Sequence, residues 1–394
     1  AVFSATAISA GIATLCMAFF ANYPVALASG MGLNAFFAFT VCGAMGYSYK
    51  VALTAVFIEG IIFMLLSLFK FREALVNKIP SNLKFAITAG IGLFIAIIAL
   101  LNANVVVASE STTVALGELS SPTVVLSLVG LLIIGALQHY KVPGGILLGI
   151  LITWVLGIMA QLVGWYVPNP EAGVYSVIPQ FSLSSFEAPK MFQFDFGFIA
   201  KNIPAFILIV FTFLYTDIFD TVGTLIGVAE KGKLLDKDGS LPNATGALMA
   251  DAVGTVVGAC LGTSTVTSYV ESSAGVAAGG RTGLTAVTTA VLFFISLIFA
   301  PIFTSIPSFA TTPAMLYVGL LMLSSIRQVK FDGDIANAIG AFLAIIMMPL
   351  TYSIANGIMF GIVSWVILKL VTGKAKDISA VMWISVVLLS LIHI

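Results

Sequence analysis

Long apolar stretches, separated by short polar segments, run through almost the whole chain. A first set covers about 3–21, 24–45, 51–69, 83–102, 122–138 and 143–166. A second set covers about 202–229, 243–262, 264–280, 282–305, 309–326, 335–350 and 353–369. Most of them approach the roughly 20 residues that an α-helix needs to cross a bilayer. The pattern predicts about 13 membrane-spanning helices, with a further apolar segment at about 378–394.

The composition supports a membrane protein and argues against a soluble enzyme. Hydrophobic residues make up 60% of the 394 residues and charged residues 9%, with a mean hydropathy of +1.12. A soluble domain is about a quarter charged. Lys and Arg together number 17, as do Asp and Glu, so no excess charge indicates nucleic acid as a partner. Cys16, Cys42 and Cys260 lack the spacing of a metal site or a disulfide framework, and we expect no cofactor.

Basic residues are concentrated in alternate loops. Lysine and arginine follow the third, seventh, eleventh and thirteenth predicted spans, whereas the loops at 103–121 and 167–200 are mainly acidic. Cytoplasmic loops of membrane proteins carry the excess of Lys and Arg. We therefore expect the chain to enter its first span from the outside, with one more helix upstream of residue 1. The final segment, 372–394, is then on the cytoplasmic side.

Two short repeats link the halves of the chain. The sequence LTAV occurs at 53–56 and 284–287, an offset of 231 residues (284 minus 53). The sequence IPS occurs at 79–81 and 306–308, an offset of 227 (306 minus 79). An odd number of spans in each half inverts the second copy in the membrane. Inverted repeats with a substrate site between the copies are typical of secondary transporters.

Five acidic residues lie inside the predicted spans, away from any basic residue. They are Glu59, Asp217, Asp220, Asp251 and Glu271. A charged residue at the bilayer centre costs about 2.5–3.5 kcal/mol, so such residues indicate a functional site by default. Asp251 is equally consistent with bracing the site, coupling, or a structural hydrogen bond, and Glu59 is better explained as structural.

One helical face of the span at 202–229 combines two of these acids with hydroxyls. Asp217 and Asp220 are three residues apart, and Thr221 continues the same face. We interpret this face as a substrate and proton site. The alternative is a polar contact between helices that Ser or Thr on a neighbour satisfies.

Two spans contain a predicted break. Residues 263–270 are only Ser, Thr, Val and Tyr, which favour an extended chain, and the Gly- and Ala-rich stretch after Glu271 favours a short helix. Thr265, Tyr269 and Val270 lie in the extended part. Non-helical backbone at this depth is tolerated where it is covered by protein or lines a cavity. In the first half, Asn34 follows a Gly-rich stretch at the equivalent place, where plain helix packing is the alternative explanation.

Four motifs together carry a family resemblance. GMGLNAFFAFTV at 30–41, DIFDTVGTL at 217–225, TSYVESSAGVAAGGRTG at 267–283 and IIMMPLTYSIANGI at 345–358 resemble the nucleobase–cation symporters of the azaguanine-like, hypoxanthine–guanine permease branch. The resemblance implies an all-α membrane fold of 14 helices in two inverted sets of seven, with short strands in broken helices 3 and 10. About 13 of these helices are expected here, because the first is absent from this chain.

The resemblance also implies a domain division. The core domain comprises 1–82 (helices 2–4) and 202–305 (helices 8–11). The gate domain comprises 83–170 (helices 5–7) and 306–371 (helices 12–14). An extracellular loop is expected at 171–201 and a cytoplasmic-side segment at 372–394. A homodimer through the gate helices is implied by the resemblance alone.

The resemblance assigns roles to particular residues. Asp217 and Glu271 hold the base, and Asn34 and Asp220 affect transport or recognition. Independently of the resemblance, Tyr215, Phe219 and Tyr269 are candidates to stack on the ring, and Val270 adjoins Tyr269. The predicted substrate-binding residues are therefore Asp217, Glu271, Asn34, Tyr269 and Val270, and the predicted coupling or supporting residues are Asp220, Asp251, Thr221 and Thr265.

The expected function is import of purine bases (hypoxanthine or guanine, with adenine or xanthine also open) by proton symport across a bacterial inner membrane. Within the same fold, a uracil, xanthine or anion transporter is the alternative, although Glu271 disfavours an anion. An uncoupled facilitator or channel would show a continuous polar lining. A membrane enzyme is disfavoured because Asp217 and Asp220, on one helix, do not face each other across a cleft.

Overall fold

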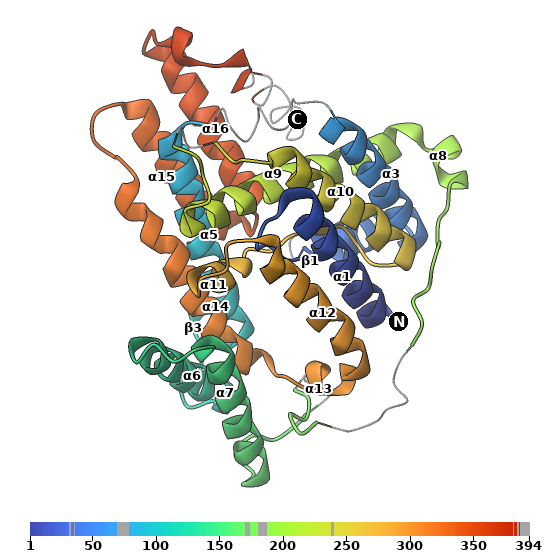
Figure 1. Cartoon of the computed structure of the whole chain (residues 1–394), viewed down its shortest axis with the longest axis vertical. Coiled ribbons are helices and arrows are strands. Elements are labelled where there is room, and N and C mark those ends of the chain that lie inside the picture. Colours follow the sequence, from blue (N-terminus) through green and yellow to red (C-terminus); the bar gives the residue numbers. More distant parts are fainter. Residues whose placement is uncertain are drawn as a thin grey trace. The chain divides into compact units, whose positions relative to one another are not determined.

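The computed structural model describes residues 1–30, 33–34, 36–68, 79–169, 174–179, 187–237, 240–380, 382–383 and 386. Within this part of the chain the fold is helical, with a few short strands (Figure 1). Nine of the described helices are long and apolar enough to cross a membrane, and two shorter apolar helices accompany them. The predicted all-helical membrane fold with strands in its broken helices is confirmed.

The helices follow the predicted spans closely. In the first half they are α1 (Val2–Ala21), η1 (Phe36–Ala44, a π-helix), α3 (Tyr49–Leu68), α5 (Ser81–Asn102), α6 (Pro122–His139) and α7 (Gly145–Leu162). In the second half they are α8 (Gly197–Lys201), α9 (Ile203–Gly232), α10 (Ala244–Leu261), α11 (Ser272–Ala277), α12 (Gly283–Ile298), α13 (Ala300–Thr304), α14 (Ser308–Leu323), η3 (Ser324–Gln328), α15 (Ile335–Thr351), α16 (Ile354–Val371) and η4 (Ala375–Asp377).

Two pairs of strands complete the described elements. Strand β1 (Leu27–Ser29) pairs antiparallel with β4 (Val266–Ser268), and β2 (Val106–Ser109) pairs antiparallel with β3 (Thr113–Leu116). The β2–β3 hairpin lies within the loop expected at 103–121. The span expected at 282–305 is two helices, because Pro301 lacks an amide hydrogen and suits the first turn of α13. The expected apolar segment at 378–394 lies largely outside the described residues.

The chain forms two compact units. The first comprises Ala1–Ile91, Phe186–Leu297 and Ser324–Ile394, and the second comprises Gly92–Ser185 and Ile298–Leu323. In the second unit, α14 packs on α6 and α7. There Ser127 Oγ donates to the Phe309 carbonyl at 3.2 Å, and the Trp154 indole N–H donates to the Val177 carbonyl at 2.8 Å.

In the first unit, α15 and α16 pack along each other (Figure 1). Charged side chains join them at one end. Asp334 caps α15 by accepting the Ala336 amide, and its carboxylate also accepts Lys369 Nζ at 2.8 Å and Lys374 Nζ at 2.9 Å. Hydrogen bonds from Lys369 and then Lys374 hold the pKa of the Asp334 carboxyl well below its usual range. This end of the pair therefore stays ionised at physiological pH.

Helix α10 approaches α1 and β4 through glycine. A Cβ at Gly254 would lie 2.7 Å from Ala13 Cβ on α1 and 3.1 Å from Val266 Cγ1 on β4. A Cβ at Gly258, one turn later, would lie 2.7 Å from Val266 Cγ2. Small residues allow such close approach between elements in membrane proteins. The two glycines therefore set how closely β4 lies against α10.

We expect Gly254→Ala to destabilise the protein by about 1–3 kcal/mol, the usual cost of overpacking. The added methyl has no flexible neighbour to displace, since Ala13 is itself a short side chain. Thermal unfolding of the purified protein in detergent measures the effect. Gly135→Ala on α6 is the matched control, because nothing lies within 4 Å of a Cβ there. Equal unfolding temperatures for the two variants would contradict the prediction.

Candidate functional site

The two predicted breaks meet in space. Leu27 pairs with Ser268, Ala28 with Thr267 and Ser29 with Val266, and all residues of both strands are buried. Pairing gives each extended segment the backbone hydrogen bonds that the bilayer does not supply. The ladder continues on either side, where the Gly30 amide donates to the Thr265 carbonyl at 3.2 Å and the Tyr269 amide to the Ala26 carbonyl at 2.9 Å. Because the strands are antiparallel, the residues that follow β1 lie beside those that precede β4, and the residues that follow β4 lie beside those that precede β1.

Asp251 holds three elements around this ladder. Its Oδ2 accepts Thr221 Oγ1 of α9 at 2.7 Å. Its Oδ1 accepts the amide of Ser268 at 2.8 Å and the Ser268 hydroxyl at 3.1 Å. The side chain is fully buried on α10. The carboxylate therefore joins α9, α10 and β4, and its donors compensate for the cost of burying the charge.

Asp217 lies on the same row of α9 as Thr221, one turn earlier. Its carboxylate is fully buried, and Thr255 Oγ1 of α10 donates to its Oδ2 at 3.5 Å. Thr255 Oγ1 also lies 3.0 Å from the Val266 carbonyl of β4. Thr255 follows Asp251 by four residues on α10, just as Thr221 follows Asp217 by four residues on α9. Each helix contributes one carboxylate and one threonine to the shared surface.

Asp220 and Glu271 are the more accessible pair of acids. Both side chains are half-buried, and Glu271 is the N-cap residue of α11 without a side-chain capping hydrogen bond. The carboxylates of Glu271 and Asp251 are close enough to Asp220 to interact with it electrostatically. Three acids from α9, α10 and the start of α11 therefore share one region.

The remaining predicted site residues lie along the ladder. The Tyr269 hydroxyl donates to the Ser29 carbonyl at 2.8 Å, which fixes the ring across both strands. Val270 and Thr265 are buried on either side of β4. Asn34 Oδ1 accepts the Ser264 hydroxyl, so the two breaks are also joined through side chains. All nine predicted site residues are thus gathered around the β1–β4 ladder, and their roles stay predictions.

Several hydroxyls of this network are not among the predicted site residues. Thr14 of α1 both donates to the Leu27 carbonyl and accepts the Leu27 amide, at 3.2 and 3.0 Å. Thr263 Oγ1 lies 2.9 Å from Ser29 Oγ, and Thr267 Oγ1 lies 2.9 Å from Thr221 Oγ1. The only available sequence signal was the spacing of four between Asp251 and Thr255. Thr263 and Thr267 lie in a stretch where Ser and Thr are common, and Thr14 lies in the apolar helix α1 without a polar pattern around it.

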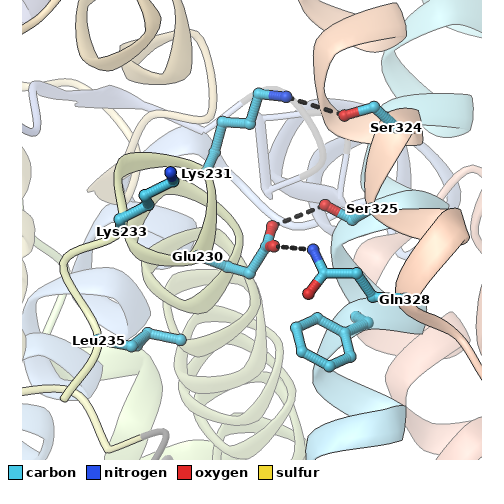
Figure 2. Close-up of a pocket in the computed structure, with 8 residues that line it drawn as sticks. Glu230, Lys231, Lys233, Leu235, Ser324, Ser325 and Gln328 are labelled. Atoms are coloured by element: carbon cyan, nitrogen blue, oxygen red, sulfur yellow. Dashed lines mark hydrogen bonds between the residues drawn. The ribbon is translucent and has the colours of Figure 1, made fainter. Parts of the chain in front are cut away.

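A separate polar cavity of about 380 Å³ lies at the end of α9 that carries lysines (Figure 2). Glu230 points across it to η3, where its carboxylate accepts Ser325 Oγ at 2.6 Å and Gln328 Nε2 at 2.7 Å. Lys231 Nζ donates to Ser324 Oγ at 2.8 Å. No predicted site residue lines this cavity. Its contacts fasten the end of α9 to η3.

Comparison with known proteins gives consistent matches along the whole chain. The model of the Permease family matches residues 1–391. The guanine/hypoxanthine permease PbuG of Bacillus subtilis is 42% identical over 384 residues, covering 97% of this chain and 84% of PbuG. The guanine/hypoxanthine permease PbuO of the same organism is 44% identical over 386 residues (96% and 85%). The adenine permease AdeQ of Escherichia coli is 41% identical over 378 residues (96% and 82%).

Solved structures support the fold at much lower identity. The transmembrane domain of the cyanobacterial bicarbonate transporter BicA aligns with a TM-score of 0.56 at 16% identity, covering 89% of this chain and 88% of that one. The murine anion transporter Slc26a9 aligns with a TM-score of 0.56 at 11% identity, covering 94% and 63%. At these identities the likeness concerns the fold alone.

Proposed function

This chain belongs to the Permease family, and from that premise we propose that it imports purine nucleobases by proton symport. It is a multi-pass membrane transporter and not an enzyme. The substrate class follows from the relatives named for guanine, hypoxanthine and adenine. The observation that carries the mechanism is the group of three carboxylates beside the β1–β4 ladder. The proposed location is the inner membrane of a bacterium.

Glu271 is the proposed primary contact of the base. It is half-buried at the start of α11, and its carboxylate makes no capping hydrogen bond to that helix. A purine presents N–H donors along one edge, and a carboxylate accepts them as charge-assisted hydrogen bonds. Tyr269, fixed by its bond to Ser29, is the proposed stacking surface. For Asp217 to contact the base as predicted, the hydrogen bond from Thr255 Oγ1 to its buried carboxylate has to break.

Proton coupling is proposed to act through the same group of acids. Three ionised carboxylates in a region of low dielectric repel one another, and taking up one proton relieves that repulsion. Asp251 is committed to three donors, so Asp220 and Glu271 are the candidates to exchange the proton. A base that binds ionised Glu271 favours protonation of Asp220. Base and proton then bind together.

Alternating access is proposed to use the two halves as inverted copies. The LTAV repeats lie in α3 and α12, and the IPS repeats lie at the starts of α5 and α14. Corresponding elements therefore carry corresponding motifs, as inverted repeats require. In this proposal, the core (1–82 and 202–305) rocks against the gate (83–170 and 306–371). The substrate region lies wholly in the core.

Uptake of radiolabelled hypoxanthine into cells that lack purine permeases tests the proposal. We expect the cells to accumulate hypoxanthine. Guanine and adenine should compete with this uptake, uracil should not, and a protonophore should abolish it. Uptake that merely equilibrates and ignores the protonophore would identify a facilitator. Competition by uracil or bicarbonate in place of guanine and adenine would assign the substrate to one of the alternatives of the same fold.

The cavity at the end of α9 gives a prediction about access. If α9 moves with the core and η3 with the gate, the Glu230 contacts must break in each cycle. We expect Glu230→Ala to make a cysteine placed at Leu235, a partly buried residue that lines the cavity, react about tenfold faster with a water-soluble maleimide. Loss of about 1.4 kcal/mol of hydrogen bonding shifts such an equilibrium tenfold.

The labelling experiment uses a chain whose three native cysteines are replaced. Glu118→Ala, on an exposed turn, is the matched control and leaves the rate unchanged. An unchanged rate in Glu230→Ala itself would show that α9 and η3 do not separate during transport.

A further inference from the structure

The polar cavity at the end of α9 carries more positive than negative charge. The charged residues that line it are Lys231, Lys233 and Glu230. The Glu230 carboxylate accepts hydrogen bonds from Ser325 and Gln328 of η3. In the described part of the chain, no ion pair joins this carboxylate to either lysine. Two ammonium groups against one carboxylate leave the cavity with a net positive charge.

Both ammonium groups have N–H bonds that no protein acceptor uses. Lys231 Nζ donates one of its three N–H bonds to Ser324 Oγ, at 2.8 Å. The Lys233 ammonium makes neither an ion pair nor a hydrogen bond with any described residue. The two lysines belong to the α9 side of the cavity, and the polar residues of η3 lie across from them (Figure 2). Lysine binds phosphate oxygens through such charge-assisted hydrogen bonds.

The rest of the lining suits a ligand that has an apolar part as well as a negative charge. Phe85 and Leu235 supply apolar surface. Phe85 is in the second turn of α5, so the positive end of the α5 dipole adjoins the negative end of the α9 dipole, and the two largely cancel. The volume of about 380 Å³ lies within the range of about 300–1,000 Å³ that is typical of sites for small organic molecules. A bare phosphate ion would leave much of it unfilled.

We propose that this cavity is a regulatory site for the phosphate group of a small organic ligand, that Lys231 and Lys233 bind this group, and that an occupied site slows transport. A ligand held by the lysines also contacts η3, so it links α9 to η3. This slowing rests on the proposed alternating access, in which α9 moves with the core and η3 with the gate. The linked elements then separate less readily in each cycle.

Two sources present a phosphate group at this place, which the positive-inside rule assigns to the cytoplasmic side. One is a nucleoside monophosphate, the product of the class of reaction that attaches a ribose phosphate to an imported purine. Its base would stack on Phe85, and the site would then provide feedback inhibition of import. The other is an anionic phospholipid, since basic pockets between membrane helices on this side bind such headgroups.

Thermal unfolding of the purified protein in detergent tests the site without transport and distinguishes the sources. The probes are GMP, guanosine (which lacks the phosphate) and phosphatidylglycerol. If the source is a nucleotide, GMP raises the unfolding temperature by about 2 °C or more beyond guanosine. If the source is a lipid, phosphatidylglycerol produces the increase and GMP does not. The same unfolding temperature with all three probes would overturn the site.

Lys233→Gly shows whether the stabilisation comes from this cavity. Lys233 has a φ of 53°, a left-handed conformation that glycine adopts more readily, so the variant should fold at least as well as the parent. Without the ammonium group, the affinity for the effective probe is expected to fall about tenfold or more. Lys141→Gly is the matched control, because Lys141 is exposed, also has a φ of 53° and does not line the cavity. An affinity that survives Lys233→Gly, or that falls equally in Lys141→Gly, would overturn the proposal.

Uptake of hypoxanthine into proteoliposomes tests the regulatory role. With the effective probe present on both sides of the membrane, uptake by the parent is expected to be about tenfold slower, and uptake by Lys233→Gly is not slowed. A parent that takes up no hypoxanthine with or without the probe refutes the proposed function, while the unfolding result still decides the site. Uptake that the probe does not slow, although the probe stabilises the parent through Lys233, refutes the regulatory role alone.

Discussion

Replacing Glu271 with Gln is expected to abolish accumulation of hypoxanthine while leaving the protein folded. Glutamine keeps the size of the side chain but removes the charge that strengthens hydrogen bonds from the purine N–H groups. Hydrogen bonds to a charged group contribute about 1.5–3 kcal/mol, which corresponds to a loss of affinity of about 10- to 150-fold. Coupling is also lost, because an amide does not repel a neighbouring carboxylate. Accumulation of hypoxanthine is therefore expected to fall by more than the loss of affinity alone would cause.

Uptake into cells and calorimetric binding to purified protein measure the two parts of this effect. Glu110→Gln, an exposed residue of the β2–β3 hairpin, makes the same chemical change elsewhere and is expected to transport normally. The unfolding temperature of Glu271→Gln should match that of the parent, because no capping bond of α11 depends on the side chain. Accumulation above a tenth of the parental level would refute the assignment of Glu271 as the primary contact.

The second large effect is expected at Asp251, and it concerns stability. Asp251→Ala leaves Thr221 and two donors of Ser268 without their acceptor in the interior. Buried donors that lose an acceptor cost about 1–3 kcal/mol each, so we expect a total loss of about 3–5 kcal/mol. Thermal unfolding in detergent measures it. Asp332→Ala, on an exposed loop, removes a carboxylate that accepts no buried donor among the described residues. This control is expected to unfold at the same temperature as the parent protein.

Asp251→Asn separates bracing from coupling. The amide oxygen still accepts the Ser268 donors, and the amide nitrogen can donate to Thr221, so most of the stability returns. If bracing is the whole role of Asp251, proton-coupled uptake returns with stability. A stable Asp251→Asn protein that binds hypoxanthine without accumulating it would instead place Asp251 in the coupling mechanism.

The membrane spans could be predicted because apolar length is a strong signal. Even the two broken spans were predictable, since runs of Ser, Thr and Val favour extended backbone and Gly permits close approach. The presence of strands in both breaks was implied by the resemblance, but their register was not predictable, because three-residue strands carry no register information of their own. The β2–β3 hairpin was missed although its strands are rich in Val, because each strand is only four residues long and lies in a segment between two predicted spans.

The site could be predicted less completely. Acids inside apolar spans are conspicuous, so the sequence identified Asp217, Asp220, Asp251 and Glu271. It did not identify the hydroxyls that surround them, because Ser and Thr occur throughout the spans and their partners are far away in the sequence. Thr263 and Ser29, for example, are 234 residues apart. The role of Asp251 depends on the three donors that its carboxylate accepts. These partners are visible only in the folded chain.

The β1–β4 ladder also has a consequence for biogenesis. Ala28 pairs with Thr267, 239 residues later in the chain (267 minus 28). At a synthesis rate of about 5–20 residues per second, β1 waits roughly 12–48 seconds for its partner to leave the ribosome. During that time its backbone polar groups have no strand to pair with in the bilayer. During this interval, the insertion machinery or a neighbouring chain has to cover the unpaired backbone groups of β1.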